Sequence, residues 1–130
     1  MDQAPIRVLL ADDDEAFVRS LRELIDSQPE LSVVAAAHNG IAAIELADEN
    51  DIHAAVVDLH MPLLDGVTTV ARLRRDHPAL CLIVLTGDSD PILHAAALDA
   101  GADAVLEKHE LAGRLIERLG RLRGNGEGRT

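Results

Sequence analysis

The sequence predicts a single α/β domain of the doubly wound (βα)5 type, in which helices cover both faces of a five-stranded parallel sheet. Short apolar runs alternate with longer segments whose apolar residues recur at helical spacing, and the connections between them are short. This alternation is typical of βαβ units. The 130 residues, of which 48% are hydrophobic, suffice for one domain with a full core.

The strands are predicted at short apolar runs that end at polar or turn-forming residues. The run Ala54-Ala55-Val56-Val57 has no interruption, as expected of a strand that is covered on both faces. The predicted strands are residues 7–11, 31–36, 54–58, 80–86 and 103–107.

The first two helices are predicted from periodicity and from the residues at their ends. The first covers residues 15–27 and is ended by Pro29, whereas the second begins at Gly40 and closes near Asn50. The expected apolar positions are Phe17, Leu21, Leu24 and Ile25 in the first helix and Ile41, Ile44 and Leu46 in the second.

Turn and capping residues delimit the remaining helices. The third helix, residues 67–76, follows the turn residues Asp65-Gly66 and stops at His77-Pro78. The fourth begins at Asp90-Pro91, a capping residue followed by proline, and ends at Gly101. The last helix begins near residue 110 with an apolar stripe formed by Leu111, Leu115, Leu119 and Leu122.

The domain is expected to span residues 6–123. Residues 1–5 form a short N-terminal extension without the basic and apolar regions of a signal peptide. Residues 124–130 are rich in glycine, and we expect a flexible tail there with no output domain after it.

Composition restricts the function classes. The net charge is −11 and no basic block offsets it, so direct nucleic-acid binding by this chain alone is not expected. No apolar stretch approaches the ~20 residues of a transmembrane helix, so no membrane contact is expected. The lone Cys81 cannot form a disulfide within the chain, which fits a reducing cytoplasm.

Chemically active side chains stand at the carboxyl ends of four predicted strands. They are Asp12-Asp13, Asp58, Thr86 and Lys108, the only lysine in the chain. Parallel strands end at the same edge of the sheet, which is where such folds bind their ligands. We therefore expect these side chains to form one acidic pocket with a single cation and one hydroxyl.

The three aspartates of this pocket predict a metal site. Adjacent carboxylates repel one another unless a cation neutralises them, and oxygen ligands suit a hard ion such as Mg²⁺, or alternatively Mn²⁺. A carboxylate can also accept a phosphoryl group. If Asp58 does so, Lys108 can offset the negative charge and the Thr86 hydroxyl can donate a hydrogen bond to a phosphoryl oxygen.

These residues and their spacing resemble the response-regulator receiver domain of bacterial two-component signalling. The resemblance covers about residues 6–123. It rests on Asp12-Asp13, on the segment Asp58-Leu59-His60-Met61-Pro62-Leu63-Leu64-Asp65-Gly66, on Thr86-Gly87 and on Lys108, all in order at strand ends. It implies a flavodoxin-like fold with strand order 2-1-3-4-5.

The resemblance also implies a role for each site residue. Asp58 is the implied phosphoacceptor; Asp13 ligates Mg²⁺ directly and Asp12 largely through water. The third protein ligand is the main-chain carbonyl of His60. Thr86 and Lys108 bind phosphoryl oxygens.

The implied donor is a histidine kinase or a histidine phosphotransfer protein. The resemblance also implies that the domain catalyses its own phosphorylation and at most a slow self-dephosphorylation, so we do not expect a turnover enzyme. Gly87 is the small residue that such domains favour beside the acyl phosphate.

The sequence departs from the family pattern at two positions. Val105 stands where many members have Tyr or Phe, the aromatic residue that moves inward with the Thr or Ser on activation. His109 follows Lys108 where many members have proline, so a cis peptide bond is not expected there. The sequence therefore does not predict which residues transmit the phosphorylation state of Asp58 to the partner surface.

Three other functions are compatible with parts of the sequence. The first is a receiver-like module that binds partners without phosphorylation. The second is a phosphatase with an aspartate nucleophile, which needs a second acid where this chain has His60. The third is a dinucleotide-binding domain, which is disfavoured because Gly124, Gly126 and Gly128 lie near the chain end and not in a strand-to-helix turn.

Several other polar residues are open to two interpretations. Asp88, two positions after Thr86, either biases hydrolysis of the phosphate or merely leads into the Asp90 cap. By analogy with the family, a second copy or a downstream protein would dock on the last two helices. The last helix carries a series that is favoured as a solvated basic face, with a partner surface as the alternative: Arg114, Arg118, Arg121 and Arg123.

Overall fold

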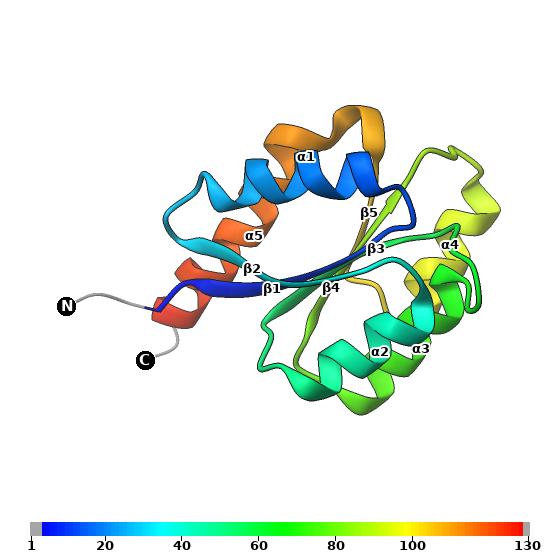
Figure 1. Cartoon of the computed structure of the whole chain (residues 1–130), viewed down its shortest axis with the longest axis horizontal. Helices are drawn as coiled ribbons and strands as arrows, with labels where there is room; N and C mark the ends of the chain where they lie inside the picture. The colour runs from blue at the N-terminus through cyan, green and yellow to red at the C-terminus, as the bar shows by residue number, and fades with distance from the viewer. Residues whose placement is uncertain (1–3, 129–130) are drawn as a thin grey trace.

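The computed structural model describes the backbone of residues 4–128 and the side chains of residues 4–109 and 113–122. A five-stranded, fully parallel sheet runs through the molecule in the order β2-β1-β3-β4-β5, which confirms the predicted fold class (Figure 1). The strands are β1 (Ile6–Ala11), β2 (Leu31–Ala37), β3 (Ala54–Asp58), β4 (Cys81–Thr86) and β5 (Ala104–Glu107).

Helices cover both faces of the sheet. The helices are α1 (Glu15–Asp26), α2 (Gly40–Glu49), α3 (Gly66–Asp76), α4 (Pro91–Ala100) and α5 (Leu111–Gly128), and a short 3-10 helix covers Lys108–Glu110. In Figure 1, α1 and α5 lie on one face, whereas α2, α3 and α4 lie on the other. None of the helices within residues 4–128 is long and apolar enough to cross a bilayer.

Two hydrophobic cores lie on the two faces of the sheet. On one face, α1 and α5 bury Leu21, Ile25, Leu115 and Leu119 against the sheet. On the other face, Val70 and Leu73 of α3 pack with small residues of α2 and α4. Every residue of β3 is buried, as its uninterrupted apolar run predicts.

The predicted apolar face of α2 is wrong at one position. Ile41 is 45% exposed, whereas the buried residues of the helix are Gly40, Ala43 and Ala47. Ile44 and Leu46 are partly buried against the core, as expected. The small alanine side chains let the α2 backbone lie close to the sheet, and this orientation turns Ile41 toward solvent.

The last helix is longer than predicted. Its backbone is helical to Gly128, so residues 124–128 of the predicted flexible tail continue α5. Glycine is a poor helix former, but each added residue only extends a helix that is already nucleated. Residues 1–3 and 129–130 lie outside the described part, and the predicted domain limits of 6–123 stay a prediction.

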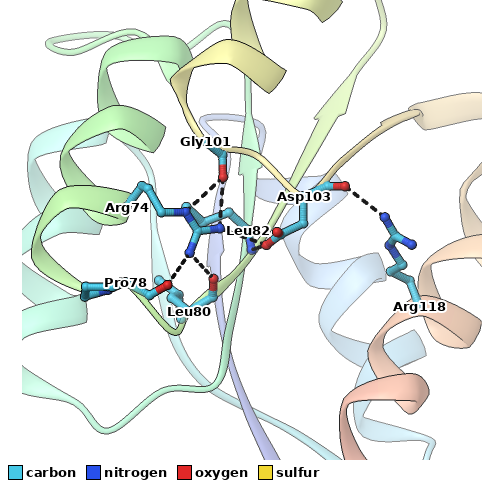
Figure 2. A network of polar contacts seen from close by, with 7 residues as sticks. All are labelled: Arg74, Pro78, Leu80, Leu82, Gly101, Asp103 and Arg118. Atoms are coloured by element: carbon cyan, nitrogen blue, oxygen red, sulfur yellow. Dashed lines mark hydrogen bonds and ion pairs between the residues drawn. The ribbon is translucent and has the colours of Figure 1, made fainter. Parts of the chain in front are cut away.

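Arg74 joins α3 to the end of α4 and the start of β5 (Figure 2). Its guanidinium donates hydrogen bonds to the main-chain carbonyls of Gly101, Pro78 and Leu80 at 2.7–3.0 Å. Gly101 has a φ of +120°, and a Cβ at this position would lie 2.7 Å from the Arg74 Cγ. Glycine is therefore required where α4 ends.

Asp103 extends this network to α5. Its Oδ2 accepts hydrogen bonds from Arg74 at 2.9 Å and from the Leu82 main-chain N–H at 2.8 Å (Figure 2). Its carbonyl accepts a hydrogen bond from Arg118 of α5 at 2.9 Å. The network therefore fixes the start of β5, the strand that Lys108 directly follows.

Candidate functional site

The carboxyl ends of β1, β3 and β5 bring four of the predicted site residues together. Asp12, Asp13 and Asp58 each offer a carboxylate oxygen within 4.8 Å of the other two. Asp12 and Asp58 are only 4% and 6% exposed, whereas Asp13 is exposed. The expected acidic pocket is present, with two buried carboxylates and one that faces solvent.

The loop after β1 holds Asp12 in place through its backbone. The Asp12 Oδ1 accepts a hydrogen bond from the Asp14 N–H at 3.0 Å. Asp14 in turn caps α1 by accepting a hydrogen bond from the Phe17 N–H at 3.1 Å. His38, for which no pattern in the sequence predicts a role, lies with its Nδ1 3.2 Å from the Asp12 carbonyl oxygen.

Lys108 reaches into the pocket from the end of β5. Its Nζ lies 2.8 Å from the Asp12 Oδ2 and 3.6 Å from the Asp58 Oδ1. Burial acts to lower the pKa of Lys108, but the hydrogen bond to Asp12 and the charges of Asp58 and Asp12 outweigh it, so the pKa is raised. Lys108 is therefore a permanent cation of the site.

An aromatic ring also positions the lysine. The Lys108 Nζ lies 4.3 Å from the centroid of the Phe17 ring, within the range of a cation–π interaction. Phe17 is the only aromatic residue in the chain. Its helical spacing predicts a core position, and only the structure shows that its ring also lies beside the lysine that follows β5.

The buried position of Asp58 changes its acidity. Burial is the largest cause and the negative charge of Asp12 the second, and together they raise the pKa of Asp58 to about 6 despite the opposing charge of Lys108. The carboxylate is therefore the major form of Asp58 at neutral pH. The positive charge of Lys108 only partly offsets the effects of burial and of the neighbouring aspartates.

The loop after β3 is built closely around Asp58. Gly66 begins α3, and a Cβ at this position would overlap the carbonyl oxygen of Asp58. The Gly66 N–H donates a hydrogen bond to the Leu59 carbonyl at 2.9 Å, and Asp65 caps the helix. In the loop between Leu59 and Asp65, Leu63 is 75% exposed and has a φ of +70°, an uncommon conformation for leucine.

Thr86 lies at the end of β4, next to the strand of Asp58, but its hydroxyl is bonded elsewhere. The side chain is fully buried, and the Oγ1 accepts a hydrogen bond from the Asp88 N–H at 2.9 Å. The same oxygen lies 3.3 Å from the Asp88 carbonyl, to which it donates. Beside it Gly87 leaves open space, because a Cβ there would meet no atom within 4 Å.

His60 and Asp88 lie close to each other in the loops that follow β3 and β4. The His60 Nε2 lies 3.7 Å from the Asp88 Oδ2, and both side chains are more than one-third exposed. Among the described residues, the side chains grouped closely enough to share a metal ion are the three aspartates and do not include His60. The main-chain carbonyl of His60 as a ligand stays a prediction.

The donor set fits a hard divalent cation. The Asp12 Oδ2 is buried and, apart from the nearby Lys108 ammonium, makes no hydrogen bond of acceptable geometry to a described residue. With Lys108 as the partner of this oxygen and two further carboxylates beside it, the site holds more negative than positive charge. An Mg²⁺ ion bound by these oxygens would relieve the repulsion among the carboxylates.

The structure shows the environment of Val105 and His109, the two positions that depart from the family pattern. Val105 is partly buried, packs against the core and pairs with Val84 of β4. It therefore offers no polar group to the site. Residues 4–128 contain no cis peptide bond, so the Lys108–His109 bond is trans, as the missing proline predicts.

Comparisons with known proteins agree with this geometry. The profile of the family described as response regulator receiver domain matches residues 8–120. The nitrate/nitrite response regulator protein NarP of Escherichia coli (strain K12) is 36% identical over 107 residues, which are 82% of this chain and 50% of NarP. This chain thus spans about half the length of that relative.

Solved structures show the same fold. The signal receiver domain of the putative response regulator NarL from Mycobacterium tuberculosis superposes with a TM-score of 0.87 at 23% identity, over 92% of this chain and 97% of the other. The isolated REC domain of RcsB from Salmonella enterica serovar Typhimurium, determined with the phosphomimetic BeF3-, has a TM-score of 0.84 at 27% identity, with coverage of 92% and 89%. The chain therefore belongs to the response regulator receiver domain family.

Proposed function

We propose that this chain accepts a phosphoryl group on Asp58 and relays a signal in a two-component system through partner binding. The observation that carries the proposal is the position of Asp58, a buried carboxylate between two further aspartates and the Lys108 ammonium. The implied donor is the phosphohistidine of a histidine kinase or of a histidine phosphotransfer protein. An Asp58 oxygen attacks phosphorus, the N–P bond breaks, and an acyl phosphate forms.

Each neighbouring residue has a part in this step. Asp12, Asp13, Asp58 and the His60 carbonyl would hold the divalent cation, which neutralises charge on the transferring group and on the acids. Lys108 already lies within 3.6 Å of Asp58 and would move to a phosphoryl oxygen. Thr86 would donate its hydroxyl hydrogen to another oxygen of the same group.

The acidity of Asp58 supports this assignment. The nucleophile has to be a carboxylate, and with a pKa of about 6 it is mostly ionised at neutral pH. Repulsion from Asp12 and Asp13 makes the ionised pocket receptive to positive charge. The three carboxylates would thus bind the cation first, and Asp58 would receive the phosphoryl group afterwards.

The surface formed by α4, β5 and α5 is the proposed partner site, for a second copy or for a downstream protein. Two apolar side chains on α4 are exposed, Ile92 at 77% and Leu98 at 49%. A groove between β5 and α5 is lined by Val105 and by arginines of α5, including Arg118 and Arg121. The fourth arginine of the predicted series, Arg123, lies outside the described side chains.

Incubation with Mg²⁺ and a small phosphodonor such as acetyl phosphate tests the proposal. Intact mass spectrometry is expected to show one phosphoryl adduct on the wild type and none on Asp58→Asn. Asp65→Asn is the matched control, because Asp65 is an exposed acid of the same loop and asparagine caps a helix equally well. Partner binding that is equal in the wild type and in Asp58→Asn would favour the module that works without phosphorylation.

A further inference from the structure

The buried hydroxyl of Thr86 is committed to the loop between β4 and α4. Its Oγ1 accepts a hydrogen bond from the Asp88 N–H and donates one to the Asp88 carbonyl, at 2.9 Å and 3.3 Å. A hydroxyl has a single hydrogen to donate. Thr86 can therefore donate either to the Asp88 carbonyl or to a phosphoryl group on Asp58, but not to both.

The same carbonyl has a second donor on α4. The His94 Nε2 lies 2.7 Å from the Asp88 carbonyl oxygen, and His94 is partly buried. A carbonyl oxygen only accepts hydrogen bonds, so the Nε2 carries the hydrogen. One oxygen atom thus links the hydroxyl next to the phosphoacceptor with a side chain in the first turns of α4.

The rest of Asp88 is also bonded within this loop. Its Oδ1 accepts a hydrogen bond from the N–H of Asp90, the residue that caps α4. The cap and His94 both tie Asp88 to the helix, Thr86 ties it to the end of β4, and its Oδ2 lies 3.7 Å from the His60 Nε2. Release of the Asp88 carbonyl by Thr86 therefore leaves this carbonyl oxygen bonded to His94 of α4.

We propose that His94, through the Asp88 carbonyl, couples the state of Thr86 to the position of α4. The inference rests on the proposed function, because a phosphoryl group on Asp58 is what draws the Thr86 hydrogen away. Once it is drawn away, Asp88 and the first turns of α4 move together. His94 is thus a positioning residue. It would transmit the change at Thr86 to α4, a task that Val105 cannot perform because it has no polar group.

Coupling of this kind acts in both directions. In the wild type, release of the Thr86 hydroxyl also requires α4 to move with Asp88, and this movement costs free energy. Without His94 the loop moves without the helix, so a phosphomimetic binds more tightly while α4 responds less. The loss of one hydrogen bond corresponds to an affinity gain of about two- to tenfold.

The experiment uses beryllofluoride with Mg²⁺ and amide NMR spectra of the full chain. In the wild type, saturation is expected to shift the amides around Asp58 and those of α4. In His94→Leu the amides around Asp58 are expected to shift as in the wild type, and the affinity for beryllofluoride is expected to rise about two- to tenfold. At least half of the shift of the α4 amides is expected to be lost. His94→Gln, which keeps an N–H donor of similar reach, is expected to restore the α4 response.

Controls separate this coupling from a general disturbance of the helix. Leu98→Ala removes a half-exposed side chain of the same helix and is expected to behave as the wild type. If His94→Leu does not fold, ¹⁵N spectra of the wild-type imidazoles provide the test. They are expected to show an Nε2–H tautomer of His94 at rest and faster exchange of this hydrogen with beryllofluoride.

The outcomes distinguish the two proposals. A wild type that binds no beryllofluoride would overturn the proposed function and the coupling with it. Normal binding by His94→Leu, with unchanged affinity and an unchanged α4 response, would overturn the coupling alone. An Nδ1–H tautomer of His94 in the resting wild type would contradict the hydrogen bond on which the coupling depends.

Discussion

Lys108 lies closer to Asp12 than to Asp58, the residue that it is proposed to serve: its Nζ is 2.8 Å from the Asp12 Oδ2 and 3.6 Å from the Asp58 Oδ1. In this state the lysine compensates the negative charge of Asp12 and Asp58, two carboxylates that are almost completely buried. A cation bound to Asp12 and Asp13 would replace it there. Lys108 would then be released toward a phosphoryl group on Asp58.

Lys108→Met is expected to destabilise the protein when divalent ions are absent. The change leaves the buried Asp12 carboxylate without its counter-charge, and it also removes the contact with the Phe17 ring. We expect the free energy of unfolding in urea with EDTA to fall by about 1–3 kcal/mol. Lys108→Arg keeps the charge and is the control, with a smaller loss; equal losses in both variants would contradict the role of the charge.

Mg²⁺ is expected to raise the melting temperature by relieving repulsion among the three aspartates. At ten times its dissociation constant, a ligand that binds only the folded state adds about 1.4 kcal/mol. For a domain of this size this corresponds to a shift of about 3–6 °C in a thermal unfolding experiment. Asp13→Asn is expected to abolish most of the shift, and a wild-type melting temperature that ignores millimolar Mg²⁺ would argue against direct ligation.

The raised pKa of Asp58 predicts how stability depends on pH in EDTA. Because the folded-state pKa of about 6 exceeds the ordinary value of 3.8, the folded state binds this proton more tightly than the unfolded state. The contribution of Asp58 to stability is therefore greatest below about pH 4 and is lost as the pH rises through about 6.

Asp58→Asn removes this ionisation and allows a direct comparison. At pH 7 the variant is expected to be more stable than the wild type by about 1–3 kcal/mol, and the difference is expected to shrink as the pH falls. Urea unfolding at a series of pH values measures it. A difference that is the same at pH 5 and pH 7 would mean that the Asp58 pKa is not raised.

Arg74→Met is expected to destabilise the fold far from the acidic pocket. The guanidinium bonds to three main-chain carbonyls and to Asp103, and methionine would leave the partly buried carbonyls of Leu80 and Gly101 without these donors. We expect a loss of about 2–4 kcal/mol in the free energy of unfolding. Arg75→Met, on the exposed side of the same helix, is the matched control and is expected to change it by no more than about 0.5 kcal/mol.

Much of the fold and of the acidic pocket was predictable from local patterns. Every predicted strand and helix is present, because uninterrupted apolar runs, capping residues and glycine or proline at element ends are local signals. Asp12, Asp13, Asp58 and Lys108 meet because parallel strands share a direction, so a strand-end position in the sequence determines the edge of the sheet.

The remaining features depend on how side chains pack between elements distant in the sequence. The ring of Phe17 over Lys108 and the five hydrogen bonds of Arg74 are contacts of this kind. The exposure of Ile41 follows from the rotation of α2 about its axis, which its mixed apolar composition does not determine. The position of His94 beside the Asp88 carbonyl likewise appears only when the loop is folded.

The central claim is that Asp58 is the residue that becomes phosphorylated. The most direct measurement is borohydride reduction of the protein after reaction with acetyl phosphate and Mg²⁺, followed by peptide mass spectrometry, because reduction converts an aspartyl phosphate into homoserine. We predict homoserine at position 58, dependent on Mg²⁺ and absent when the phosphodonor is omitted. Homoserine at another aspartate, or at none while a control receiver reacts, would contradict the claim.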